Sequence, residues 1–205
     1  MTKDSDVVAG LSTLLAAGSE ESDLQRYLEQ HPWLLLRYPP DPPLVVSQLP
    51  LGPDYRADFA YFFWTSAGSY LQLIEIESPR LEIFNRDDHF SAKFNAALQQ
   101  LEDWAIWSRR HPDSIAALFE PLCEQGLIKQ VPLFSSLRLL LIAGRRSQIS
   151  NTLRRRRWEE RIARQSSHTE IRTLEGFIES IGLATGSHWK VPCVRYRKQS
   201  YEVLS

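Results

Sequence analysis

The stretch Leu71-Gln-Leu-Ile-Glu-Ile-Glu-Ser-Pro79 decides how this chain folds and where its chemistry lies. Apolar residues dominate it and a proline closes it, which predicts a β-strand from Leu71 to Ser78. Side chains alternate between the two faces of a strand, so Glu75 and Glu77 point the same way, about 7 Å apart. Two carboxylates on one face of an apolar strand are costly to bury unless they are paired or bound to a metal ion.

A third acidic residue, on the preceding segment, joins this pair. Residues 55–64 are rich in aromatic side chains, which is typical of a strand, and residues 66–69 predict a turn. An antiparallel hairpin centred on that turn places Asp58 opposite residues 75–77. The three carboxylates then form a patch of hard oxygen ligands that suits Mg²⁺ or Mn²⁺. The alternative interpretation is an ordinary solvated sheet face that carries acidic residues.

Length and composition limit the class of protein. The chain has 205 residues, for which we expect a short helical preface at residues 1–20 and a single domain over residues 21–205. It contains no run of 18 apolar residues and begins with a polar, acidic segment, so we expect no membrane span and no secretion signal. Its two cysteines lie far apart in the sequence, so we expect a cytoplasmic protein without a disulfide scaffold. It lacks the glycine-rich phosphate loop of NTPases, so we expect no nucleotide cofactor.

The net charge of −1 hides an uneven distribution of charge. Residues 145–164 contain eight arginines and only two glutamates. A dense arginine cluster is a candidate surface for binding the phosphates of nucleic acid, and Arg154, Arg155, Arg156 and Arg157 are its densest part. The alternative is a solvated helix face with internal salt bridges.

The remaining segments predict the order of the elements. Six prolines between residues 39 and 53 predict a structured loop or a short edge strand around Leu44–Val46. Helical periodicity is longest over residues 87–110, whereas residues 137–143 are apolar over most of their length and short enough for a buried strand. Residues 147–165, which hold the arginine cluster, predict another helix. A hairpin that feeds a mixed sheet through helical crossovers predicts an α/β fold with helices flanking the sheet.

This order of elements, with Asp58 and Glu75-Ile-Glu77 on the hairpin, resembles the PD-(D/E)XK restriction-endonuclease-like fold. Further motifs narrow the resemblance to Shedu-type nuclease domains, and it covers roughly residues 21–180. It implies a bacterial antiphage defence nuclease that acts on DNA and forms homo-oligomers. The motifs are Leu24-Gln-Arg-Tyr-Leu-Glu-Gln-His-Pro-Trp-Leu-Leu35, Tyr55-Arg-Ala-Asp-Phe-Ala60, Ile74-Glu-Ile-Glu-Ser-Pro79, Ala97-Leu-Gln-Gln-Leu-Glu-Asp-Trp104 and Leu140-Leu-Ile-Ala-Gly-Arg145.

The resemblance also implies roles for the residues of the hairpin. Asp58 and Glu75 would ligate Mg²⁺ or Mn²⁺, with the Ile76 carbonyl as a third ligand, for hydrolysis of DNA phosphodiester bonds. Glu77 stands where most members of the fold carry lysine, and it would serve as a base toward water or help to hold a second metal. Because glutamate cannot supply the positive charge of that lysine, the alternative is a catalytically inactive module. Such a module would bind nucleic acid or a partner as a sensor or regulator.

Three residues on two helices are further candidates for the same site. Gln100 matches a glutamine that the family carries on the helix after the acidic strands, and this match makes it a candidate catalytic residue. The alternative is that Gln100 is a glutamine on the helix surface that caps the edge of the sheet. Lys93 lies seven residues earlier on the same helical stripe, and either replaces the missing strand lysine or is an ordinary solvated lysine. Glu21, near the start of the opening helix, either completes the acidic cluster or is favourably placed at a helix N-terminus.

Overall fold

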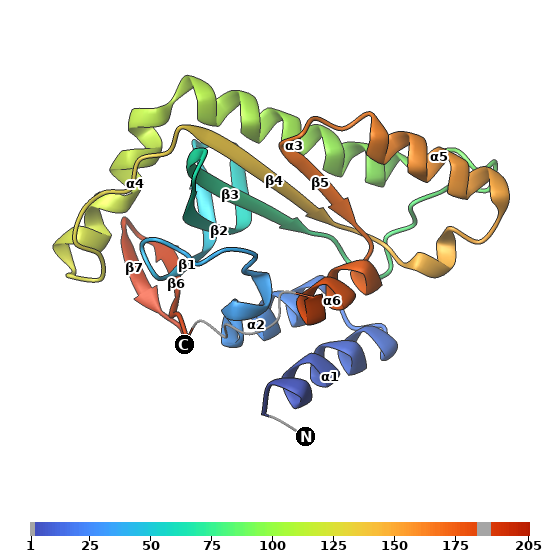
Figure 1. Ribbon diagram of the computed structural model, residues 1–205, viewed down its shortest axis with the longest axis horizontal. Coiled ribbons are helices and arrows are strands. Elements are labelled where there is room, and N and C mark those ends of the chain that lie inside the picture. The colour runs from blue at the N-terminus through green and yellow to red at the C-terminus, as the bar shows by residue number, and fades with distance from the viewer. Residues whose placement is uncertain (1–2, 184–189) are drawn as a thin grey trace.

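The computed structural model describes residues 3–183 and 190–205, and its described strands form a seven-stranded mixed sheet (Figure 1). The strands lie side by side in the order β5-β4-β3-β2-β1-β6-β7. Three neighbouring pairs are parallel, namely β3–β4, β4–β5 and β1–β6, and the other three are antiparallel. The strand bounds are β1 Val45–Leu51, β2 Tyr55–Thr65, β3 Gly68–Ile76, β4 Ser136–Ile142, β5 Thr169–Arg172, β6 Cys193–Arg197 and β7 Ser200–Val203.

Helices cover both faces of the sheet, which gives three layers (Figure 1). One face carries α1 (Lys3–Ala16), α2 (Glu21–Gln30) and α6 (Leu174–Leu183), and the other carries α3 (Ala92–Arg110), α4 (Pro112–Glu124) and α5 (Thr152–Ala163). Short 3-10 turns, η1 (Pro32–Leu35) and η2 (Arg146–Gln148), follow α2 and β4. The α/β fold expected from the sequence is confirmed, and it is compatible with a restriction-endonuclease-like domain. None of the described helices has the length and apolar character needed to span a bilayer.

Each face of the sheet buries its own apolar core, and alternation along β3 assigns its residues to the two cores. Leu73 packs in the core beneath α3, together with the fully buried Trp104. Ile74 packs in the opposite core, together with Leu28 of α2. Burying a side chain of this size is worth about 1.5–3 kcal/mol, so both faces resist a shift of register. Glu75 therefore has to point toward α3.

The hairpin of β2 and β3 has the predicted register. Thr65 pairs with Gly68 and Phe59 pairs with Ile74, so the turn is centred where the sequence placed it. Continued by one residue, this register sets Asp58 opposite Glu75. The β2–β3 ladder ends at the pair of Phe59 and Ile74, while β3 continues its parallel pairing with β4.

The proline-rich segment is a loop over residues 39–44, as predicted, but the strand that follows it is not an edge strand. β1 lies inside the sheet, antiparallel to β2 and parallel to β6. Pro50 fits there because β6 pairs only with residues 45–47, and the missing N–H of Pro50 falls beyond that ladder. The partner strand β6 is far away in the sequence, so local composition did not reveal it.

The helix that holds the arginine cluster is shorter than predicted. α5 begins at Thr152, where the side chain of Asn151 accepts a hydrogen bond of 2.8 Å from the Arg154 N–H. The residues before it form η2 and a turn instead. Trp158 is the buried residue of α5, so the helix lies on the surface of the molecule with one anchoring side chain.

Candidate functional site

Asp58 lies where the ladder between β2 and β3 ends. Its Oδ2 accepts a hydrogen bond of 2.8 Å from the Ile76 N–H, and its Oδ1 accepts one of 3.0 Å from Gln48 Nε2. The Ile76 amide has no partner in the β2–β3 ladder, and a buried N–H needs an acceptor. The Asp58 carboxyl takes the place of that ladder acceptor and is thereby held in one orientation.

The backbone carbonyl of Ile76 faces the same side of β3 as its N–H. In a strand the N–H and C=O of one residue point to one side, and those of its neighbours point to the other. The Glu77 N–H donates to the Ile142 carbonyl of β4 at 2.9 Å. Ile76 must therefore direct both of its backbone groups toward β2 and Asp58.

Glu75 is buried on the α3 side of the sheet, with 9% of its surface exposed. Gln100 Nε2 donates to its Oε1 at 3.0 Å. Its Oε2 is buried and accepts no hydrogen bond from an N–H or hydroxyl group of the described residues. Burial, and after it the charges of Asp58, Glu77 and Glu21, raise the pKa of Glu75 to about 10, and a hydrogen bond with the Asp58 carboxyl also helps to raise it. An ionised Glu75 therefore lacks a compensating cation.

Asp58 titrates together with Glu75. Burial is the main cause that raises the pKa of Asp58 to about 6, and the charge of Glu21 raises it further, whereas the hydrogen bond from Ile76 opposes the shift. Two interacting carboxyls share their protons, so these values describe the pair. The pair therefore keeps its protons to a higher pH than two isolated carboxyls would.

Glu77, Glu21 and Lys93 lie around this pair. Burial is the main cause that raises the pKa of Glu77; Glu21 and Asp58 add to the rise, and the positive charge of Lys93 opposes it. Lys93 of α3 and Glu21 of α2 are thus within electrostatic reach of one carboxyl, although they come from opposite layers. The fold brings together on one patch all seven candidates that the sequence singled out from the hairpin and the two helices.

The acidic patch alone does not make a complete metal cage. Within the described parts of the chain, no three His, Cys, Asp or Glu side chains are grouped closely enough to hold a metal ion. The set that remains is Asp58, Glu75 and the Ile76 carbonyl. These groups fit Mg²⁺ or Mn²⁺, hard ions that take oxygen ligands and keep several waters. The buried Oε2 of Glu75 supports this fit, because it lies in a pair of carboxyls to which the described residues supply no cation, and burying such a pair in the ionised form is costly.

The arginines of α5 are largely occupied by contacts within the protein. Arg154 Nε donates to Asp88 Oδ1 at 2.5 Å, and Arg157 donates to the backbone carbonyl of the same residue. Arg156 forms an ion pair of 3.0 Å with Glu160. Arg155 is exposed, and no described residue forms an ion pair with it. The binding of DNA by this cluster stays a prediction, with Arg155 as its least restrained member.

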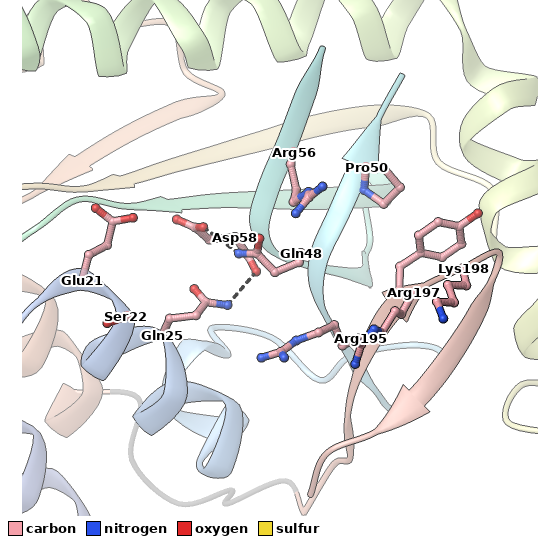
Figure 2. A pocket seen from close by; sticks show the side chains of 11 residues that line it. Glu21, Ser22, Gln25, Gln48, Pro50, Arg56, Asp58, Arg195, Arg197 and Lys198 are labelled. Atoms are coloured by element: carbon pink, nitrogen blue, oxygen red, sulfur yellow. Dashed lines mark hydrogen bonds between the residues drawn. The ribbon is translucent and has the colours of Figure 1, made fainter. Parts of the chain in front are cut away.

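A hollow of about 750 Å³ opens beside Asp58 (Figure 2). Its basic residues lie on β2 and on the hairpin of β6 and β7, and none of them stood out in the sequence as a candidate. The run Arg195-Tyr-Arg-Lys198 was the signal available in the sequence, but it is short and gave no indication of its neighbours in space. The lining residues are Glu21, Ser22, Gln25, Gln48, Pro50, Arg56, Asp58, Arg195, Tyr196, Arg197 and Lys198.

An open α/β sheet with acidic residues on its central hairpin is compatible with a nuclease-like domain. The family model described as Shedu protein SduA, C-terminal, matches residues 18–178, and the chain therefore belongs to the Shedu family. Membership of this family implies a role in antiphage defence. No curated protein matches the sequence. The match contains every acidic residue of the patch and ends before β6 and β7.

Proposed function

We propose that the chain is a metal-dependent endonuclease that hydrolyses phosphodiester bonds of DNA in antiphage defence. The observation that carries the proposal is the buried carboxyl pair of Glu75 and Asp58, in which Oε2 of Glu75 has no N–H donor, in a chain of the Shedu family. A divalent cation bound by Asp58, Glu75 and the Ile76 carbonyl supplies a Lewis acid for a phosphate oxygen and for the attacking water.

The residues around the two carboxyls prepare them for a cation. Gln48 and the Ile76 N–H hold Asp58 in one orientation, so no rotamer freedom is left for it to lose on binding. Gln100 donates to Oε1 of Glu75 and leaves Oε2 without an N–H donor. Burial of the site strengthens every charge interaction within it.

Glu77 is proposed as the general base. Its pKa is raised by burial and by Glu21, which moves it toward the neutral range in which a carboxylate accepts a proton from water effectively. Lys93 is close enough to lower that pKa, so it supplies a positive charge beside a strand that carries none. In this proposal Glu77 and Lys93 together take over the role of the lysine that most members of the fold carry on this strand.

A second candidate function is an inactive module that binds nucleic acid or a partner as a sensor or regulator. The observation that favours it is Glu77 in the position usual for lysine, together with the lack of a three-side-chain metal group in the described residues. The two candidates differ in one measurable property, which is cleavage that depends on a divalent metal.

Metal removal tests the proposed function directly. Supercoiled plasmid incubated with the protein and Mg²⁺ or Mn²⁺ should be converted to nicked or linear forms. EDTA should stop the conversion, and excess Mg²⁺ should restore it. Intact plasmid with both metals, in protein that also shows no heat of metal binding by calorimetry, would favour the inactive module.

Gln100→Ala should slow cleavage by roughly tenfold, because a hydrogen bond to a carboxylate is worth about 1.5 kcal/mol. Glu75 would keep its charge but lose the partner that orients it. Single-turnover rates at saturating Mg²⁺ measure the effect. Gln99→Ala is the matched control, since Gln99 is exposed and donates to Asp103 instead. Equal rates for the two variants would remove Gln100 from the site.

A further inference from the structure

The hollow beside Asp58 is acidic at one end and basic at the other (Figure 2). Glu21 and Asp58 lie at the acidic end. Arg56 of β2 and the residues Arg195, Arg197 and Lys198 of the C-terminal hairpin supply the positive charges. A concave surface with charge of one sign concentrates the opposite charge near it, so the basic end attracts polyanions.

Sheet topology brings these cations together from distant parts of the sequence. β6 runs parallel to β1, with Arg195 beside Ser47, and β1 runs antiparallel to β2, with Pro50 beside Arg56. The basic residues of β2 and of the C-terminal hairpin therefore lie on the two sides of β1. The hairpin stands outside the region that matches the family.

The guanidinium group of Arg195 is held by contacts within the protein. Its Nη2 contacts both carboxylate oxygens of Glu29 at 2.5 Å, and Glu29 is only 5% exposed. Ser47 Oγ and Gln25 Nε2 donate to the same carboxylate, at 2.5 and 3.2 Å. This network joins β6 to β1 and α2, and it fixes the position of the hairpin next to the acidic patch.

The other three cations have no such partner. Arg56, Arg197 and Lys198 are exposed, and they form no ion pair with any residue that the structure describes. Lys198 and Gln199 both have positive φ, 50° and 62°, at the two central positions of the hairpin turn. Such a tight turn presents Lys198 at a defined place on the rim rather than on a long loop.

We propose that Arg56, Arg197 and Lys198 form a phosphate-binding strip that holds the backbone of the nucleic-acid strand to be cut beside Asp58. The cutting rests on the proposed function, whereas the binding does not. Asp58 lines the same hollow, so a strand that lies on the strip passes directly by the site. Most arginines of α5, in contrast, are already paired within the protein.

The test is the affinity for labelled DNA, measured by fluorescence anisotropy in EDTA at several KCl concentrations, with one duplex and one single strand. The triple variant Arg56→Gln, Arg197→Gln, Lys198→Gln should weaken binding at least about tenfold at 0.1 M salt. The slope of the logarithm of the binding constant against the logarithm of the salt concentration should become shallower for each phosphate contact that is lost. The change should be about 0.9 per contact on duplex DNA and about 0.7 on single-stranded DNA, so measuring both DNAs also identifies the form that is bound.

The matched control is the triple variant Arg86→Gln, Arg110→Gln, Lys129→Gln. It removes the same number of arginines and lysines from exposed positions outside the hollow. The proposed strip is refuted if both triple variants weaken DNA binding equally. It is also refuted if the salt dependence of binding is the same in the strip variant as in wild type. Circular dichroism establishes that each variant is folded, and the single variants Arg56→Gln and Lys198→Gln replace the triple if it is not.

The two proposals fail in different ways. If wild-type protein cleaves with Mg²⁺ but the strip variant binds DNA normally, the strip is wrong and the proposed function stands. If wild-type protein never cleaves but the strip variant alone loses affinity, the strip stands and the proposed function fails.

Discussion

Asp58→Ala should lower the rate of Mg²⁺-dependent DNA cleavage by about a thousandfold or more, which corresponds to about 4 kcal/mol of lost transition-state stabilisation. The substitution removes one of the two carboxylates proposed as metal ligands. It also removes the acceptor of the Ile76 N–H, whose carbonyl completes the proposed set. Nicking of supercoiled plasmid under single-turnover conditions measures the rate.

Two further variants separate charge from structure in this experiment. Asp58→Asn keeps a carbonyl oxygen for the Ile76 N–H but removes the negative charge, so it should be nearly as inactive as alanine while remaining at least as stable as wild type. Asp54→Ala is the control, because Asp54 is exposed and precedes β2. Cleavage by Asp58→Ala at the wild-type rate would refute the assignment of the site.

Glu75→Gln should make the metal-free protein more stable near pH 8. The pKa of Glu75 is about 10 in the folded protein against an ordinary value of 4.5, so the folded state holds a proton that the unfolded state has released. Stability from this group is therefore complete below about pH 4.5 and declines as the pH rises toward 10. Glutamine does not ionise and avoids the decline. A tenfold difference in proton affinity between the two states corresponds to about 1.4 kcal/mol, so the gain near pH 8 should be at least of that size.

Urea unfolding in EDTA at about pH 5 and pH 8 measures this effect, and Mg²⁺ should stabilise the wild type more than the variant. A ligand at a hundred times its Kd stabilises the folded state by about 2.7 kcal/mol, and only the wild type retains the Glu75 ligand. Glu102→Gln, on the exposed side of α3, should behave as wild type at both pH values. If Mg²⁺ stabilises the Glu75→Gln variant as much as wild type, Glu75 is not a ligand.

The hairpin and its acidic residues could be predicted from the sequence because the signals involved are local. Alternation along residues 71–78 and a short turn after the first strand were enough to set the register, since slipping by one residue would exchange the two faces. The structure has that register, with Phe59 opposite Ile74. The family of the chain followed from the same short motifs.

Other parts of the site depend on contacts between segments far apart in the chain. Helix periodicity places Gln100 on a stripe of α3, but only the packing of α3 on the sheet brings its amide to Glu75. Likewise, Glu21 reaches the acidic patch because α2 packs on the opposite face. No local pattern encodes such distances.

The sequence by itself determined the class of fold, the strand register and the identity of the acidic residues, because side-chain alternation and turn chemistry act over a few residues. Only the tertiary structure decided that the strand within the proline-rich segment, β1, is an interior strand and that the C-terminal hairpin lies beside it. The physical reason is that a strand buried between two partners is stabilised by hydrogen bonds from both, and one of these partners, β6, comes almost at the end of the chain. The hollow that joins the acidic patch to the basic strip exists for the same reason.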